Sequence, residues 1–508
     1  MYYVLQKQYS MKKIIGGLTG LFPFFCNAQT MAIGNKIDSV FKPFVDFLAT
    51  IIFYQPFARW GFEMPIVVIW LMTGALFFTL YFKFINLRGF KHAIDLTRGI
   101  YDNPEDKGEV SHFQALVTAL SGTVGLGNIA GVATAIAIGG AGATFWMIVA
   151  GLLGMSSKFL ECTLAVKYRK IDENGIVSGG PMYYLYEGLK IRNKKGLGKF
   201  LAITFSILAI GGSFGGGNMF QANQSFAQLA NVFPAFEGKG FEFGLLLAIF
   251  VGVVIIGGIK KIASVTDKMV PFMVLFYVLS SLMIIGINYQ HIGDAFVRIF
   301  HGAFSADSLK GGFLGVMIIG FKRASFSNEA GVGSAAIAHS AAKTDRPVSE
   351  GIVSLLEPFI DTVVICTMTA LVLVFTGFDE NTQGLDGSKL TSAAFSSVYA
   401  PFKYLLTVAI LLFAFSTMIS WSYYGMKAWT YLFGNTKKME LVYNSLFLVF
   451  VVIGASSSLN AVMDFSDMMI LGMAFPNILG LYFMAGEVKL DLKNYFDDLK
   501  SGKIVRHK

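Results

Sequence analysis

Residues 121–131 read SGTVGLGNIAG and lie within an apolar run, residues 112–138, that is long enough to cross a membrane. Hydrocarbon offers no hydrogen-bond partner to backbone amides or carbonyls, so a membrane span normally needs an intact helix. The four glycines of this stretch weaken a helix, and they occupy its middle. The stretch therefore predicts a helix that unwinds near its midpoint, which is tolerated where the backbone is buried in protein or lines a cavity.

The composition indicates a membrane protein. The 508 residues are 54% hydrophobic and 14% charged, whereas a soluble protein carries about a quarter charged residues. The mean hydropathy is +0.60. The three cysteines (Cys26, Cys162, Cys366) have no paired spacing, so neither a disulfide framework nor a zinc site is indicated. We expect an all-α polytopic membrane protein.

Two segments precede the first expected span. Residues 1–28 combine a basic start after Met11, a short apolar run and small residues, which predicts a signal peptide with an upstream extension. A short retained helix is the alternative. Residues 29–63 are expected at the periplasmic surface, because Lys42, Asp46 and Arg59 interrupt their apolar face.

About eleven membrane spans are expected from apolar runs of roughly 20 residues. They are an extra first helix at 64–85, followed by 112–138, 142–166, 200–227, 242–258, 268–287, 311–338, 350–376, 394–433, 440–457 and 463–485. The run 394–433 is long for one crossing, so we expect a short external helix ahead of Pro401.

Lysine and arginine are concentrated in alternate loops, such as 167–199, and in the basic tail, 486–508. The positive-inside rule then places the C-terminus in the cytoplasm and the mature N-terminus outside the plasma (inner) membrane. This topology accounts for the formal charge of +9 without a nucleic-acid partner.

Residues 112–287 and 311–485 each hold five expected spans, and the two sets have opposite orientations. Each set opens with a helix interrupted by glycines and polar residues, the second at KRASFSNEAGVGSA, residues 322–335. This pattern is typical of inverted-repeat secondary transporters. Unwound carbonyls can bind a cation there, and helix-end amides can bind an anionic group.

The first interrupted helix supplies the first candidate binding residues. Gly125 and Gly127 permit the unwinding, while Thr123 and Asn128 add polar groups at the same depth. Close helix packing is an alternative explanation for the small residues. An asparagine at bilayer depth within a double glycine break favours a binding site.

GGSFGGGNMFQANQ, residues 211–224, places Asn218, Gln221 and Gln224 on one helix face. Neutral amides can hold an ammonium or a carboxylate without the cost of burying a full charge. We expect Gln221 to contact substrate. For Asn218 and Gln224, hydrogen bonding between helices is an equal alternative.

The second interrupted helix brings Ser325 and Asn328 together with Glu329. An ionisable residue at this depth indicates function, but Glu329 could equally neutralise Arg323. Asp361 is the other expected buried acid. It either binds a coupling ion or accepts hydrogen bonds from the nearby threonines, which are Thr362, Thr367 and Thr369.

FAFSTMISWSYYG, residues 413–425, sets Ser416 beside Thr417 near mid-span. Adjacent hydroxyls suit a hard cation such as sodium, and bonding back to the preceding helical turn is the alternative. Trp421 either walls off a small-substrate pocket or belongs to an interfacial aromatic belt.

Catalytic patterns are missing from the sequence, which has no H-E-x-x-H, Walker or C-x-x-C motif. The histidines fall in loops, at span ends or in the tail, so no Ser–His pair is expected at bilayer depth. We therefore expect no enzyme and no cofactor.

Four motifs occur in order between residues 64 and 485: GTVGLGNIAGVATAIAIGGAGATFWM, GGGNMFQAN, FSNEAGVGSA and STMISWSYYG. They resemble the alanine or glycine:cation symporter family, of the sodium:alanine type. The resemblance implies a leucine-transporter-type inverted repeat of five plus five helices. It also implies inward movement of alanine or glycine with sodium, or in some members with protons. Leu126, Thr144 and Ile148 depart from the usual family pattern and leave the substrate choice open.

The V-G-L-G-N run also resembles neurotransmitter–sodium symporters. That likeness implies a sodium site made by carbonyls of Ser121 and Val124 with hydroxyls of Ser416 and Thr417. It implies that the backbone from Gly125 to Gly127 meets the substrate carboxylate. The alanine-family likeness implies that Gln221 and Trp421 line the pocket.

The sequence thus predicts a carrier that imports small neutral amino acids with sodium by alternating access. Its expected partners are the amino acid, sodium and the lipid bilayer. A proton-coupled carrier of the same fold is the main alternative. An ion channel would show a repeated pore element, which is missing from the sequence.

Overall fold

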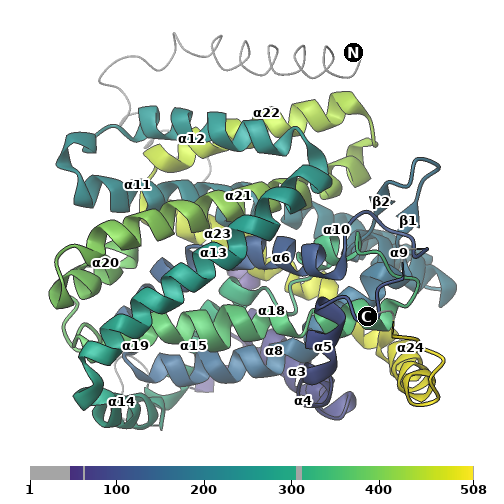
Figure 1. The fold of residues 1–508 in the computed structure, drawn as a ribbon, viewed down its shortest axis with the longest axis horizontal. Coiled ribbons are helices and arrows are strands. Elements are labelled where there is room, and N and C mark those ends of the chain that lie inside the picture. Colours follow the sequence, from purple (N-terminus) through teal and green to yellow (C-terminus); the bar gives the residue numbers. More distant parts are fainter. Residues whose placement is uncertain (1–45, 61–62, 104, 305–311, 507–508) are drawn as a thin grey trace.

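The computed structural model describes residues 46–506 except 61–62, 104 and 305–311, and it is nearly all helical (Figure 1). The predicted signal peptide lies outside the described residues. Of the segment expected at the membrane surface, residues 46–52 are helical. In the described part, the strands β1 (Lys170–Ile171) and β2 (Val177–Ser178) form one short antiparallel pair.

Seven continuous helical segments are long and apolar enough to span a membrane. They are Gly142–Lys167 (α8), Lys195–Val232 (α10, η4 and α11), Gly258–Ile287 (α13), Pro347–Phe375 (α17, α18, η7 and α19), Phe402–Phe433 (α21), Lys437–Ser456 (α22) and Leu459–Lys500 (α23 and α24). Two shorter apolar helices are α3 (Ile66–Tyr81) and α12 (Gly240–Ile255). The all-helical membrane fold is confirmed, while the count of eleven spans stays a prediction.

The first interrupted helix is bent at the expected place. α6 (His112–Thr123) starts with a capping box in which Ser111 and Gln114 exchange hydrogen bonds of 3.2 Å. It ends where Val124 leaves the helical conformation. The chain resumes as the π-helical turn η3 (Gly127–Gly131) and α7 (Val132–Gly139), at 52° to α6.

The second interrupted helix is α15 (Gly312–Asn328), followed by an irregular stretch and the short α16 (Ala336–His339). Three residues after α15 have left-handed backbone: Glu329 at φ 56°, Gly331 at φ 86° and Gly333 at φ 92°. A side chain is uncommon in that region of conformational space. The contacts around Glu329 must therefore stabilise its left-handed backbone conformation.

The glycine-rich segment before Asn218 has a packing role. The segment consists of α10 (Lys195–Phe214), the π-helical turn η4 (Gly215–Met219) and α11 (Phe220–Val232). A Cβ at Gly217 would overlap with the Trp421 ring of α21. Small residues at this turn thus let α21 approach closely and bury its tryptophan.

The remaining elements are short surface helices and a bent terminal segment. The surface helices are α4 (Ile85–Arg88), α5 (Phe90–Thr97), α9 (Pro181–Ile191) and α14 (Ile292–Phe304). The run 394–433 divides as expected, into α20 (Gly387–Val398) and α21. α23 (Leu459–Gly472) and α24 (Ala474–Lys500) cover the expected last span, 463–485, and the helix continues through most of the predicted tail.

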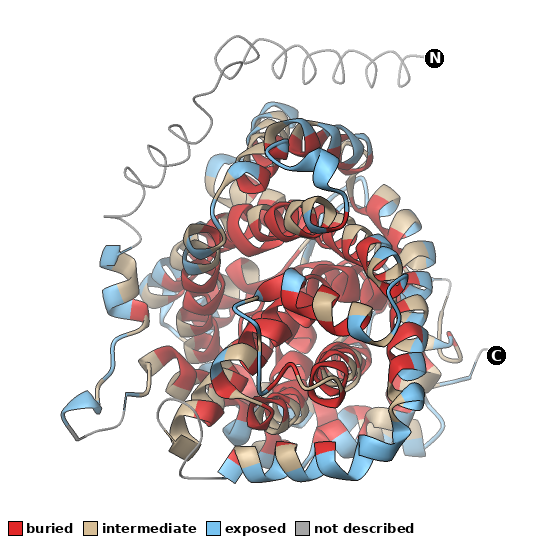
Figure 2. Cartoon of the chain, turned by 90° about the vertical axis from the view of Figure 1, so that its left-hand side faces the viewer, coloured by how far each residue is buried: buried red, intermediate tan, exposed pale blue. Residues whose placement is uncertain are grey.

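The helices pack around a buried centre, shown red in Figure 2. α12 packs beside α22, and α8 packs beside α15 (Figure 1). The outer helices expose apolar side chains, as lipid-facing helices do; those of α12 and α13 include Leu246, Ile249, Phe250, Val253, Phe272, Leu275 and Leu279. The two interrupted helices lie inside this shell.

Candidate functional site

The two breaks meet in the interior. A Cβ at Gly127, in the first break, would stand 3.5 Å from the Cα of Ser327, near the end of α15. Both positions are buried. The irregular backbone is therefore surrounded by protein, which is the condition that permits it at membrane depth.

Neutral side chains hold the freed amides of the first break. The Gly125 amide donates to Asn128 Oδ1 at 2.9 Å, and the Leu126 amide donates to Gln221 Oε1 at 3.0 Å. Gln221 is fixed in turn by its own donation to the Gly216 carbonyl at 2.8 Å. The chain thus presents two aligned backbone donors to acceptor oxygens, the arrangement that a carboxylate can use.

α21 is hydrogen-bonded to α6, the part of the first broken helix that precedes the break. Ser121 Oγ donates to the Ser416 carbonyl at 2.7 Å, and Ser420 Oγ donates to the Thr118 carbonyl at 3.0 Å. Ser416 Oγ bonds back to the Phe413 carbonyl at 2.9 Å, as the alternative interpretation of this pair expects. A donating hydroxyl still has lone pairs for a cation.

Thr417 behaves differently from Ser416. Its Oγ1 is buried and has no hydrogen-bond partner among the described residues. It faces the first break so closely that a Cβ at Gly125 would overlap with it. A buried unsatisfied hydroxyl costs about 1–3 kcal/mol, so Thr417 Oγ1 has hydrogen-bonding capacity that the described residues leave unused.

The other predicted substrate residues lie around the two breaks. Thr123 Oγ1 points back to the Ala119 carbonyl at 3.3 Å, within α6. Asn328 donates to Thr362 Oγ1 and accepts from the Ala330 amide, both at 2.9 Å. Ser325 is buried one turn earlier, and its carbonyl accepts from the Glu329 amide at 3.1 Å.

Trp421 is only 1% exposed, so it is no interfacial belt residue. Its Nε1 donates to Glu329 Oε1 at 3.0 Å, and Ser334 donates to the other carboxyl oxygen. The predicted alternative of a Glu329–Arg323 pair is wrong, because Arg323 forms its ion pair with Asp467. Glu329 instead links the second break to α21.

Asp361 joins both breaks to η7 (Phe359–Cys366). Its carboxylate accepts from Asn128 Nδ2 at 2.6 Å, Ser327 Oγ at 2.9 Å and Thr362 Oγ1 at 2.7 Å. Of the three nearby threonines, Thr362 alone donates to it: Thr367 donates to the Thr362 carbonyl and Thr369 to the Asn128 carbonyl.

The three amides expected on one helix face have different neighbours. Gln221 reaches the first break, but Asn218 donates to the Phe447 carbonyl of α22 at 2.6 Å. Gln224 accepts from the Ser388 amide of α20 at 3.0 Å. The π-helical turn that contains Asn218 shifts it from the regular helical spacing, so Asn218 and Gln224 here tie helices together.

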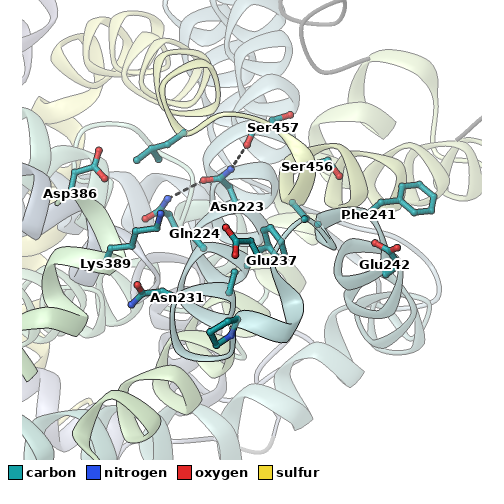
Figure 3. Close-up of a pocket in the computed structure, with 18 residues that line it drawn as sticks. Asn223, Gln224, Asn231, Glu237, Phe241, Glu242, Asp386, Lys389, Ser456 and Ser457 are labelled. Carbon is teal, nitrogen blue, oxygen red and sulfur yellow. Dashed lines mark hydrogen bonds between the residues drawn. The ribbon is translucent and has the colours of Figure 1, made fainter. Parts of the chain in front are cut away.

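A cavity of about 880 Å³ opens beside α11 (Figure 3). Asn223 and Gln224 line it together with Glu237, with Asp386 just before α20 and with Lys389 of α20. α20 also reaches the first break, where Thr391 Oγ1 donates to the Ile129 carbonyl at 3.4 Å. α20 therefore covers the broken helix from the side of this cavity.

Sequence reasoning missed a cluster of buried charges. Lys158 Nζ lies 3.1 Å from Glu357, and Glu161 accepts from Asn477 at 2.7 Å. His339 is the last residue of α16 and His112 the first of α6, so both lie at helix ends as expected, but both are buried inside the protein. The signal was visible: Lys158 and Glu161 stand three residues apart in an otherwise apolar span.

Residues 48–508 match the sodium:alanine symporter family. The chain belongs to that family. It is 41% identical to the sodium/alanine symporter AgcS of Methanococcus maripaludis, over 86% of this chain and 94% of that protein. It is 34% identical to the probable sodium/glutamine symporter GlnT of Bacillus subtilis, over 86% of this chain and 89% of that protein.

Among solved structures, the chain resembles MhsT in complex with L-phenylalanine, with a TM-score of 0.51 and 13% identity. The match covers 76% of this chain and 98% of that one, and it establishes the leucine-transporter-type fold. The family is one of multi-pass membrane transporters and not of enzymes. Family and fold together support sodium-coupled amino-acid transport.

Proposed function

We propose that this symporter imports small neutral amino acids of the alanine or glycine type, driven by sodium, by alternating access across the plasma (inner) membrane. The observation that carries the proposal is the buried, unpaired hydroxyl of Thr417, which faces Gly125 where α6 unwinds. A sodium ion needs several oxygens, and the break supplies carbonyls beside this hydroxyl.

The proposed sodium site consists of the carbonyls of Ser121 and Val124 and the hydroxyls of Ser416 and Thr417. Ser121 already contacts Ser416, so the two helices that would share the ion are in register. All four residues are buried, at 0–2% exposure. Sodium is cargo and coupling ion here, and the proposal invokes no cofactor.

The proposed substrate site lies next to the ion. The amides of Gly125 and Leu126 would exchange Asn128 and Gln221 for the amino acid's carboxylate, since these neutral side chains hold them now. Thr123, Gly127, Ser325 and Asn328 would complete the wall. Trp421 packs against Gly217 and closes one side of the proposed substrate site, which favours a substrate with a small side chain.

Direction follows from the loop charges, which place α20 and its cavity outside and the C-terminus in the cytoplasm. α20 would have to leave the first break for substrate to enter. Sodium would favour that outward-open state only as far as it binds that state more tightly.

A proton-coupled carrier of the same fold is the second candidate, favoured by the buried histidine–glutamate pairs near the breaks. Radiolabelled alanine uptake into proteoliposomes separates the two. The proposal expects uptake that follows an imposed sodium gradient and competes with glycine. Uptake that follows a pH gradient in sodium-free buffer would overturn it, and competition by glutamine alone would overturn the choice of substrate.

A further inference from the structure

A continuous chain of buried ionisable side chains connects α6 to α8. His112, at the start of α6, contacts Glu350 of α17 (Pro347–Val353). The other oxygen of Glu350 lies 2.5 Å from His339 Nδ1, whose Nε2 lies 3.4 Å from Glu357 of α18 (Leu356–Pro358). Glu357 pairs with Lys158 of α8 at 3.1 Å. None of the five is more than 4% exposed.

The ion pairs of this cluster contain more carboxylates than lysines. Two carboxylates, Glu350 and Glu357, stand against the single lysine Lys158. Uncompensated buried charge is strongly unfavourable. The two imidazoles, each against a carboxylate, are the groups that can supply the missing positive charge.

Other charged groups face the chain from neighbouring segments. Asp102 and Asp106 lie in the loop before His112, Arg169 lies near Glu350, and Glu329 lies near Lys158. Arg169 is engaged by backbone carbonyls, at 2.9 Å from that of Ser340.

The chain has one end at a cavity and the other at the second break. His112 lines a cavity of about 310 Å³ together with Asp106, Arg346 and Lys503. At the other end, Glu161 accepts from Asn477, whose amide also donates to the Gly331 carbonyl at 2.9 Å. The histidines belong to the two broken helices, while the carboxylates they contact lie on α17 and α18.

We propose that His112 and His339 bind protons that the carrier exchanges with solution through the cavity lined by His112. Chains of acids and histidines act as proton relays in other membrane transporters. Each uptake forms one imidazole N–H bond with a proton from hydronium and needs no other reactant. A conformational change that moves α6 or α16 away from α17 breaks a histidine–glutamate pair. The number of protons bound to the carrier is then linked to substrate binding. That linkage rests on the proposed function.

The first test needs no substrate. Nitrogen-15 NMR of the histidine-labelled, purified protein at pH 7 should show two imidazolium signals that disappear, one each, in His112→Gln and His339→Gln. The exposed His301 of α14 provides the control, because His301→Gln should leave both signals. Neutral imidazoles at both positions would overturn the proposal.

The second test counts protons during binding. Alanine binding with saturating sodium is measured by calorimetry in buffers of different ionisation enthalpy, and the slope of heat against that enthalpy gives the protons exchanged. We expect a slope in the parent and in His301→Gln that is lost in His339→Gln. Binding with zero slope in the parent, or an unchanged slope in His339→Gln, contradicts the linkage. Absence of alanine heat would instead refute the proposed function, while the NMR result still decides the protonation.

Discussion

The two broken helices are built from different chemistry. The first break uses glycines and neutral groups, with Asn128 and Gln221 holding its amides. The second contains Glu329 in a left-handed conformation and ends in His339, which contacts two glutamates. Neutral oxygens and amides can exchange partners for an ion or a zwitterion at little cost, whereas buried charges need fixed partners. The first break is therefore the one whose hydrogen-bond partners can be replaced by cargo at little cost, as the proposed site requires.

The largest effect is expected from filling the first break. In Gly125→Ala, the new methyl overlaps with Thr417 Oγ1 and lies 3.2 Å from Gln221 Oε1. Overpacking costs about 1–3 kcal/mol, so we expect sodium-driven alanine uptake to fall by roughly tenfold to hundredfold. Uptake by whole cells at matched surface expression measures this.

Gly131→Ala is the matched control, since its methyl would have no atom closer than 4.0 Å. Gly131 ends the π-helical turn that follows the break, and Gly131→Ala should retain most of the activity. Equal losses in both variants would mean that the break tolerates no side chain anywhere and would remove the specific role of Thr417.

Truncation of Gln221 should have the next largest effect. Gln221→Ala removes the side chain that, once displaced from the Leu126 amide, is expected to contact the substrate, and a lost polar contact of about 1.5 kcal/mol corresponds to roughly tenfold in uptake at limiting substrate. Asn218→Ala serves as the comparison, because Asn218 bonds to α22. Asn218→Ala should lower the thermal stability of the carrier with little change in its apparent affinity for alanine. The opposite ranking would exchange the roles of the two amides.

The smallest effect is expected at the second break. Glu329→Gln keeps an oxygen for the Trp421 indole and replaces the carboxyl group by an amide. We expect the maximal uptake rate to change by about threefold, in line with a contact worth less than 1 kcal/mol, and the sodium dependence to stay constant. A sodium half-saturation that rises as strongly as in a Thr417 variant would place the ion at the second break instead.

Both breaks were predictable from sequence, because glycines, serines and asparagines inside apolar runs are rare and have few explanations. The hydrogen-bond and ion-pair partners of the residues near the breaks were less predictable. The helix to which Asn218 bonds depends on a π-helical turn. Arg323 and Asp467, which form an ion pair, lie 144 positions apart in the sequence. The buried cluster around His339 was missed for the same reason: helical spacing shows which residues share a face but not which distant helix covers them. The helix of the tail continues to Lys500 because its apolar face packs inward, with Val488, Leu492 and Tyr495 buried.

The central claim is that sodium binds where α6 unwinds against α21, and Thr417→Val tests it most directly. The change keeps the volume and removes the unpaired oxygen, while Thr430→Val removes a hydroxyl of the same helix that bonds back to Lys427. The measurement is the sodium concentration for half-maximal alanine uptake in proteoliposomes. For Thr417→Val we expect this sodium concentration to rise roughly tenfold or more, as for a lost charged contact of about 1.5–3 kcal/mol. For Thr430→Val we expect no change. An unchanged sodium requirement in an active Thr417→Val carrier would contradict it.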